Sequence, residues 1–219
     1  MIPIADESPK GYVPFVNYAI ITANILVFFF WEQTTETFFQ IYGLIPARFL
    51  AYPLDAHNYV TIFTSMFMHG GFFHLFGNML YLWIFGDNIE YTVGHFRYLI
   101  FYFTVGISAA LFQTLAFPDS TVPMVGASGA ISGVLGAYLV KFPTNRISIL
   151  FFFFFIIRIF KVPAAIVLSL WFFFQLWNGF FNFTAQSSEG VAWFAHIGGF
   201  LAGFILIKLF DRYPRRWLV

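Results

Sequence analysis

Six polar residues lie in or at the ends of long apolar segments: His69, His74, Asn78, Ser128, Ser132 and His196. Polar and ionisable side chains are costly inside a membrane-spanning helix, so residues of this kind are functional candidates by default. A serine hydroxyl is a weak nucleophile until a base takes its proton, and histidine is the usual base near neutral pH. We therefore predict acyl-transfer chemistry with Ser128 as nucleophile and His196 as base.

The other candidates fit a site that stabilises negative charge. His74 and Asn78 are spaced i and i+4, so they share one face of a helix. A tetrahedral intermediate needs donors for its oxyanion, which His74, Asn78 and the Ser128 backbone N–H could supply. No carboxylate is evident as a partner for His196, because the acidic residues near the apolar segments lie at their ends or in loops: Asp87, Glu90, Asp119 and Glu189. We expect a Ser–His dyad.

The composition shows which elements must position these residues. Of 219 residues, 60% are hydrophobic and only 10% are charged, against about 25% charged in ordinary soluble domains. With a mean hydropathy of +0.78, the outside of the protein must itself be apolar, as in lipid. We predict an all-α integral membrane protein. A net charge of +1 does not give the positive electrostatic field that attracts nucleic acid. The absence of cysteine excludes disulfides and thiolate metal ligands.

A helix that crosses a bilayer core of about 30 Å needs roughly 20 apolar residues. Six segments are predicted to form a six-transmembrane-helix bundle, a single domain over residues 1–219: residues 14–31, 66–86, 98–117, 128–142, 164–183 and 191–210. Residues 32–65 form a predicted extracytoplasmic insertion in the membrane interface. The apolar run within residues 146–160 is too short to cross as a helix, so we expect an interfacial hairpin.

Lysine and arginine accumulate on the cytoplasmic side of membrane proteins. If the N-terminus is inside, only Arg48 falls outside, and the other ten basic residues fall inside: Lys10, Arg97, Lys141, Arg146, Arg158, Lys161, Lys208, Arg212, Arg215 and Arg216. Both termini are therefore predicted to be cytoplasmic. The first segment is expected to remain as an anchor, because Asp6 and Glu7 occupy what would be the basic region of a signal peptide.

This topology places the candidate residues together. The second, fourth and sixth segments run from outside to inside, so His74, Asn78, Ser128 and His196 cluster toward the extracytoplasmic side. Residues 128–142 reach only about 22 Å as a helix, so Ser128 must start below the outer surface. Irregular backbone at that depth requires burial in protein or a water-filled cavity, which predicts a sunken, wet pocket.

Small residues are expected to bring the serine and the histidine together. Gly199 and Gly203 lie on the same helix face as His196. Small residues let membrane helices approach closely, so this face is predicted to press against the helix that starts at Ser128. Ser132, one turn after Ser128, is expected to pack rather than react.

Four motifs together resemble the rhomboid family of intramembrane serine proteases, over residues 66–210. They are His69-Gly70-Gly71-Phe72-Phe73-His74 followed by Asn78, the GxxxExxxG element from Gly86 through Glu90 to Gly94, Gly126-Ala127-Ser128-Gly129, and Ala195-His196-Ile197-Gly198-Gly199. The resemblance implies Ser128 as nucleophile, His196 as base, and His74 with Asn78 around the oxyanion. His69, Gly126 and Gly199 are expected to be structural, and Glu90 with Arg97 to cap or brace a cytoplasmic turn.

The same resemblance implies a function. Its substrates would be single-pass transmembrane proteins, cleaved at or near the extracytoplasmic boundary, with no metal or organic cofactor. Substrate entry would be gated by the fifth span and by residues 181–190, with four aromatic residues facing lipid or the gate: Phe172, Phe173, Phe174 and Trp177. We expect a protein of the bacterial or archaeal type in a prokaryotic inner (cell) membrane.

Other classes of membrane protein fit the sequence less well. A channel or transporter would distribute polar residues along a whole pathway, whereas here they concentrate at one depth. A membrane zinc protease would need a motif such as HExxH, which does not occur. The remaining alternative is a catalytically inactive rhomboid-like protein that binds transmembrane clients. Such a protein would normally have lost the nucleophile or the base.

Overall fold

A computed structural model describes residues 2–7, 11–30, 36–153, 156–185 and 190–211. Within them the helices are α1 (Phe15–Phe30), α2 (Glu36–Tyr42), α3 (Pro46–Ala51), α4 (Ala56–Thr64), the 3₁₀ turn η1 (Ser65–Phe67), α5 (Phe72–Val93), α6 (His95–Ala116), α7 (Ser128–Lys141), α8 (Ala164–Thr184) and α9 (Trp193–Phe210). The strands are β1 (Ile2–Ala5), β2 (Arg146–Phe153) and β3 (Ile156–Pro163).

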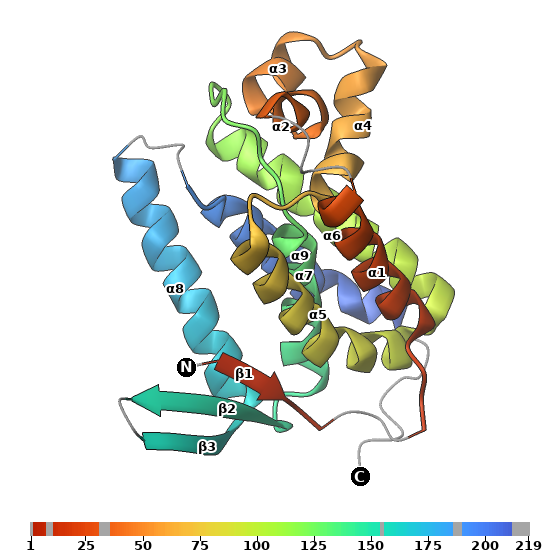
Figure 1. Ribbon diagram of the computed structural model, residues 1–219, viewed down its shortest axis with the longest axis vertical. Helices are drawn as coiled ribbons and strands as arrows, with labels where there is room; N and C mark the ends of the chain where they lie inside the picture. The colour runs from red at the N-terminus through yellow and green to blue at the C-terminus, as the bar shows by residue number, and fades with distance from the viewer. Residues whose placement is uncertain (1, 8–10, 31–35, 154–155, 186–189, 212–219) are drawn as a thin grey trace.

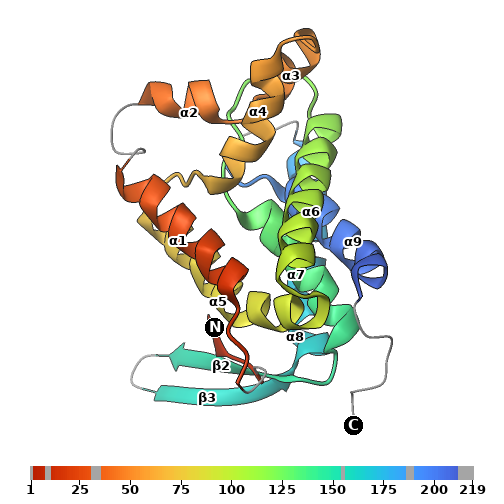
Figure 2. The same ribbon diagram turned by 90° about the vertical axis from the view of Figure 1, so that its right-hand side faces the viewer.

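The long helices form a bundle whose two ends differ. Figures 1 and 2 show the short helices α2, α3 and α4 at one end, here the insertion end, and the three strands at the other, here the sheet end. In the described chain, α6, α8 and α9 are each long and apolar enough to cross a membrane, and α1 is a shorter apolar helix. The protein is therefore an integral membrane protein whose core is a helical bundle.

Each predicted span corresponds to one long helix, with one clear difference in boundaries. Residues 66–71 are not part of α5, because η1 and the Gly70-Gly71 pair precede its first turn. The helix instead continues past Gly86 to Val93. One polar group in this extension is held by a partner far along the chain: the Asn88 Nδ2 amide donates to Asp6 Oδ2 at 2.7 Å. Partnered polar groups allow the helix to continue where hydropathy alone predicts its end.

Glu90 in this extension holds the start of α1. Its carboxylate is fully buried and accepts hydrogen bonds from the backbone N–H groups of Val16 (3.0 Å) and Asn17 (2.7 Å), and it pairs with His95. The first N–H groups of a helix have no partner within the helix, and a negative charge there also matches the helix dipole. The sequence predicted that Glu90 and Arg97 cap or brace a cytoplasmic turn. Glu90 instead caps the start of α1 from within the neighbouring helix α5.

The prediction of an all-α protein is wrong at the sheet end. Strands β1, β2 and β3 form an antiparallel sheet in that order, with Ile2 opposite Leu150 and Arg146 opposite Pro163. The residues of β2 and β3 are rich in isoleucine and phenylalanine, which favour strands. The hairpin expected within residues 146–160 is present, and extends to Pro163. The segment was too short to cross as a helix, and pairing with β1 satisfies backbone groups of β2 that a lone hairpin leaves open.

The basic residues are distributed unevenly between the two ends. Arg48 lies on α3 at the insertion end, whereas six others lie on the strands or on helix turns at the sheet end: Arg97, Lys141, Arg146, Arg158, Lys161 and Lys208. Lys10, Arg212, Arg215 and Arg216 lie outside the described residues. Lys141 at the end of α7 pairs with Asp211 just after α9, and Asp6 accepts a hydrogen bond from Tyr138. The first and last described segments are therefore both tied to the last turn of α7 at the sheet end.

Helices α7 and α9 cross with their backbones in contact. A Cβ atom added to Gly203 would lie 1.8 Å from the Gly133 carbonyl oxygen, and one added to Gly199 would lie 2.0 Å from the Gly129 oxygen. Both distances are far below any real contact, so only glycine fits at these positions. Small residues permit close helix approach in membrane proteins, and here they fix the spacing of the two helices that carry Ser128 and His196.

Candidate active site

Ser128 and His196 are hydrogen-bonded to one another. Ser128 is the first residue of α7, and His196 lies in the first turn of α9. The Ser128 Oγ and His196 Nε2 atoms are 2.8 Å apart, and both residues are half-buried. This distance is within reach for a general base that takes a proton from a hydroxyl. The sequence predicted this pair, and the contact between the glycine faces of α7 and α9 brings it together.

The turn before Ser128 requires glycine at position 126. Gly126 has φ +126°, a conformation that side chains other than glycine rarely adopt. Its backbone N–H donates to the carbonyl oxygen of Ser65 at 2.8 Å, which ties the turn to η1. A Cβ atom added to Gly126 would lie 2.8 Å from His74 Nε2 and 3.5 Å from Ser128 Oγ. The absence of a side chain here lets the imidazole of His74 approach the serine.

His74 presents a hydrogen-bond donor to this turn. The backbone N–H of Gly70 donates to His74 Nδ1 at 3.3 Å, so in the neutral ring the proton is on Nε2, the atom that faces Gly126. Asn78 follows one turn later on α5 and is buried, and its Nδ2 atom has no hydrogen-bond partner in the described part of the chain. His74 and Asn78 are therefore two donors on the helix that packs beside the start of α7.

The two remaining polar candidates, His69 and Ser132, lie next to His74 and Ser128 respectively. His69 is buried with its ring edge-on to that of His74, at a centroid distance of 5.1 Å. The Ser132 hydroxyl donates to the Ser128 carbonyl oxygen at 2.6 Å, within α7 itself. Ser132 therefore packs within its helix, as predicted.

Two glutamines near the site were not predicted from the sequence. Gln175 on α8 lies with its Oε1 atom 2.8 Å from His196 Nδ1, on the side of the ring away from Ser128. Gln113 on α6 accepts a hydrogen bond from the backbone N–H of Ala195 at 3.1 Å. Each is a single amide in an apolar helix, so nothing in its spacing distinguishes it from a packing residue. Only the packing of α6 and α8 against α9 brings these amides to the histidine segment.

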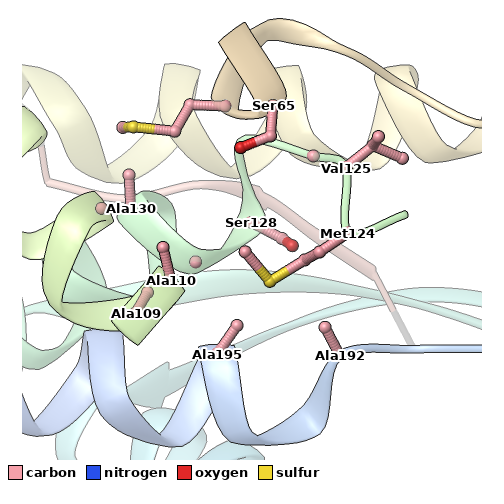
Figure 3. Close-up of a pocket in the computed structure, with 13 residues that line it drawn as sticks. Ser65, Ala109, Ala110, Met124, Val125, Ser128, Ala130, Ala192 and Ala195 are labelled. Carbon is pink, nitrogen blue, oxygen red and sulfur yellow. The ribbon is translucent and has the colours of Figure 1, made fainter. Parts of the chain in front are cut away.

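A small cavity lies beside Ser128, at the predicted place (Figure 3). It encloses ≈ 20 Å³, about enough for one water molecule. Glycine, alanine and methionine residues line most of it, and the polar residues at its wall are Ser65 and Ser128. Figure 3 shows Ala192 and Ala195 on the α9 side and Ala109 and Ala110 on α6. Within the described residues, no group of three or more His, Asp or Glu side chains forms a metal site.

The predicted aromatic face of α8 is only partly exposed. Phe173, Phe174 and Trp177 are each more than half exposed on the outside of the bundle. Phe172 does not face outward like these three, because its ring stacks on Phe200 of α9 at a centroid distance of 4.3 Å. Of the loop expected to gate substrate entry, residues 186–189 lie outside the described residues.

Comparison with known proteins agrees with this architecture. The family model of the Rhomboid domain matches residues 56–212. The chain is 30% identical over 209 residues to "Rhomboid protein 1, mitochondrial" of Saccharomyces cerevisiae, covering 90% of this chain and 52% of that protein. It is 30% identical to "Rhomboid protease GluP" of Bacillus subtilis, covering 87% of this chain and 34% of that protein.

A third relative, "RHOMBOID-like protein 5" of Arabidopsis thaliana, is 34% identical over 145 residues, covering 66% of this chain and 42% of that protein. The chain spans about half the length of these relatives, or less. The family model nevertheless covers well over half of the chain and includes the whole of the Ser128–His196 site. The chain belongs to the rhomboid family.

Proposed function

We propose that this protein is an intramembrane serine endopeptidase that cleaves transmembrane proteins through a Ser128–His196 dyad and an acyl-enzyme. The observation that carries the proposal is the 2.8 Å hydrogen bond between Ser128 Oγ and His196 Nε2. A nucleophile and its base within hydrogen-bond distance are the structural signature of covalent acyl transfer. Membership of the rhomboid family, with a named protease among the relatives, supports the same chemistry.

The residues perform the reaction in two steps. Ser128 Oγ attacks the scissile carbonyl while His196 Nε2 takes its proton, and the protonated histidine then gives that proton to the leaving amine. The oxyanion accepts hydrogen bonds from the Ser128 backbone N–H, His74 Nε2–H and the Asn78 amide, which stabilise the charge as it develops. Water, activated by His196, then hydrolyses the ester on Ser128 and regenerates the hydroxyl.

The substrate class follows from where the dyad lies. Figure 1 shows α7 beginning beneath the short helices of the insertion end, so a substrate must bring its backbone into the bundle. We propose that the six long helices all cross the bilayer, with the insertion end outside, residues 36–64 in the outer interface, and the sheet in the inner interface. The basic residues at the sheet end support this orientation, and with it cytoplasmic termini. Cleavage then occurs near the extracytoplasmic boundary.

The identity of the membrane is a separate proposal. The prokaryotic inner membrane predicted from the sequence gains no support from the relatives, because the yeast protein is named mitochondrial and the name of the Bacillus subtilis protein gives no location. That location therefore stays a prediction from the sequence.

The decisive experiment is labelling with a fluorescent fluorophosphonate, which reacts with activated serines, in detergent-solubilised protein. Wild type should be labelled, Ser128→Ala should not, and His196→Ala should react at least about 100-fold more slowly, because base catalysis is lost. Ser132→Ala is the matched control, since it removes a hydroxyl from the next turn of α7 and should label like wild type. An unlabelled wild type beside a reactive control protease would favour the inactive client-binding alternative.

A further inference from the structure

One buried amide contacts the candidate base on the side away from the nucleophile. Gln175 Oε1 lies 2.8 Å from His196 Nδ1, and the glutamine is 6% exposed. We propose that Gln175 is a positioning residue that holds the His196 imidazole in the tautomer able to accept the Ser128 proton. This inference rests on the proposed Ser128–His196 chemistry and adds to it a third residue from a third helix.

The hydrogen bonds around Gln175 fix the direction of its amide. Gln175 Nε2 lies 3.2 Å from the carbonyl oxygen of Trp171, one turn earlier on α8. A carbonyl oxygen only accepts, so the amide nitrogen must face Trp171 and Oε1 must face His196. Because Oε1 also only accepts, the proton of the neutral imidazole must be on Nδ1. The Nε2 lone pair then faces Ser128 Oγ, as a general base requires.

An amide suits this place better than a charged partner. A carboxylate buried among apolar helices would carry a large desolvation cost, whereas a neutral amide orients the ring without adding a charge. The rings of Trp171 and Trp193 lie near the imidazole, at centroid distances of 6.1 and 6.2 Å. The two tryptophan rings therefore flank the His196 imidazole, while Gln175 sets its tautomer.

The contact also links the base to the position of α8. This helix is attached loosely: 22% of its most apolar stretch is buried, against 44% for α6 and 39% for α9. Gln175 and the carbonyl that orients it both belong to α8. If α8 moves away from α9, the acceptor leaves His196 Nδ1 and the imidazole is free to adopt the other tautomer. The base is therefore oriented only while α8 packs against α9.

The first test compares rates of fluorophosphonate labelling across pH. Gln175→Met keeps the length of the side chain but removes the hydrogen-bond acceptor. This variant should react with fluorophosphonate about 10- to 100-fold more slowly near neutral pH, because part of the rate gain from base catalysis is lost. Gln175→Glu keeps an acceptor, so it should recover much of the rate. It should also move the acid limb of the pH–rate profile to higher pH, because a carboxylate stabilises the imidazolium.

Asn178→Leu is the matched control. Asn178 lies three residues later on α8, and its amide makes the equivalent bond to the Phe174 carbonyl at 2.7 Å. This variant should keep both the rate and the pH profile of wild type. A loss of rate in Asn178→Leu as large as in Gln175→Met would assign the effect to α8 as a whole and overturn the positioning role.

The second test reads the tautomer directly, without activity. In ¹⁵N-histidine-labelled protein, the signal that is lost in His196→Ala should show a protonated Nδ1 and an unprotonated Nε2, and Gln175→Met should give a mixture. A wild-type His196 protonated on Nε2 would overturn the proposal even if Gln175→Met fails to fold. If fluorophosphonate fails to react with the wild-type protein, the proposed function is contradicted instead. The ¹⁵N measurement of the His196 tautomer still decides the role of Gln175.

Discussion

Helix α9 contacts α7 and α8 in two different ways. Toward α7, glycines bring the backbones together: a Cβ on Gly203 or Gly199 would collide with a carbonyl oxygen of α7. Toward α8 the contact is made by side chains, with Phe172 stacked on Phe200 and Gln175 bonded to His196. The first contact sets the distance between serine and histidine and leaves little freedom. The second sets the orientation of the histidine and can be altered by moving one helix.

The difference has a physical cause in the membrane. Apolar side chains gain little from leaving lipid for another helix, so helices associate through close packing and interhelical hydrogen bonds. The α7–α9 contact uses the closest packing available, that of two backbones. The α8–α9 contact relies on a ring stack and an amide, while much of α8 faces outward with exposed aromatic side chains. We expect mutations at the two contacts to differ accordingly in stability.

The largest effect is expected from Gly203→Val at the α7–α9 contact. The new Cβ would lie 1.8 Å from a backbone oxygen that no side-chain rotation can move. The helices must separate, which should lower the free energy of unfolding by more than about 3 kcal/mol, above the usual cost of overpacking. Thermal unfolding in detergent and Ser128 labelling should both show the loss. A variant with wild-type stability would mean that the two helices do not touch as described.

A smaller effect is expected from Phe172→Ala at the α8–α9 contact. Loss of the stack on Phe200 should lower the free energy of unfolding by about 2 kcal/mol, from lost packing and lost ring contact. Labelling of Ser128 should slow as well, because α8 then holds Gln175 less firmly. Phe173→Ala is the matched control: its ring is 54% exposed, so stability should change by less than about 0.5 kcal/mol. Equal losses in the two variants would contradict the described face of α8.

The two contacts were not equally predictable from the sequence. The α7–α9 contact was predicted because Gly199 and Gly203 share one helix face with His196. The spacing of small residues along a helix is a local property that the sequence shows directly. The helices themselves followed from the lengths of the apolar segments. Glu90 was predicted to cap or brace a cytoplasmic turn with Arg97, and it instead caps the start of α1 from a helix that continues further than hydropathy indicates.

What sequence reasoning missed depends on pairing between distant segments. Strand β1 pairs with β2 across more than 140 residues of sequence. Neither segment has a sequence pattern that predicts which strand it pairs with. Gln175 likewise has no local signal, since one amide in an apolar helix is equally consistent with a bond to its own backbone. It has that bond as well, to Trp171, and only the packing of α8 against α9 adds His196.

The smallest effect is expected from Gly179→Ala on α8, which tests whether glycine is required at both contacts. A Cβ there would lie 3.0 Å from Ile197 Cδ1, the flexible end of a side chain, rather than from backbone. Alanine favours a helix over glycine by about 1 kcal/mol, which should offset a shift of a few tenths of an ångström in the isoleucine. The free energy of unfolding should therefore change by less than about 1 kcal/mol. A loss as large as that of Gly203→Val would show that α8 is held as rigidly as α7, and that its loose attachment cannot explain control of His196.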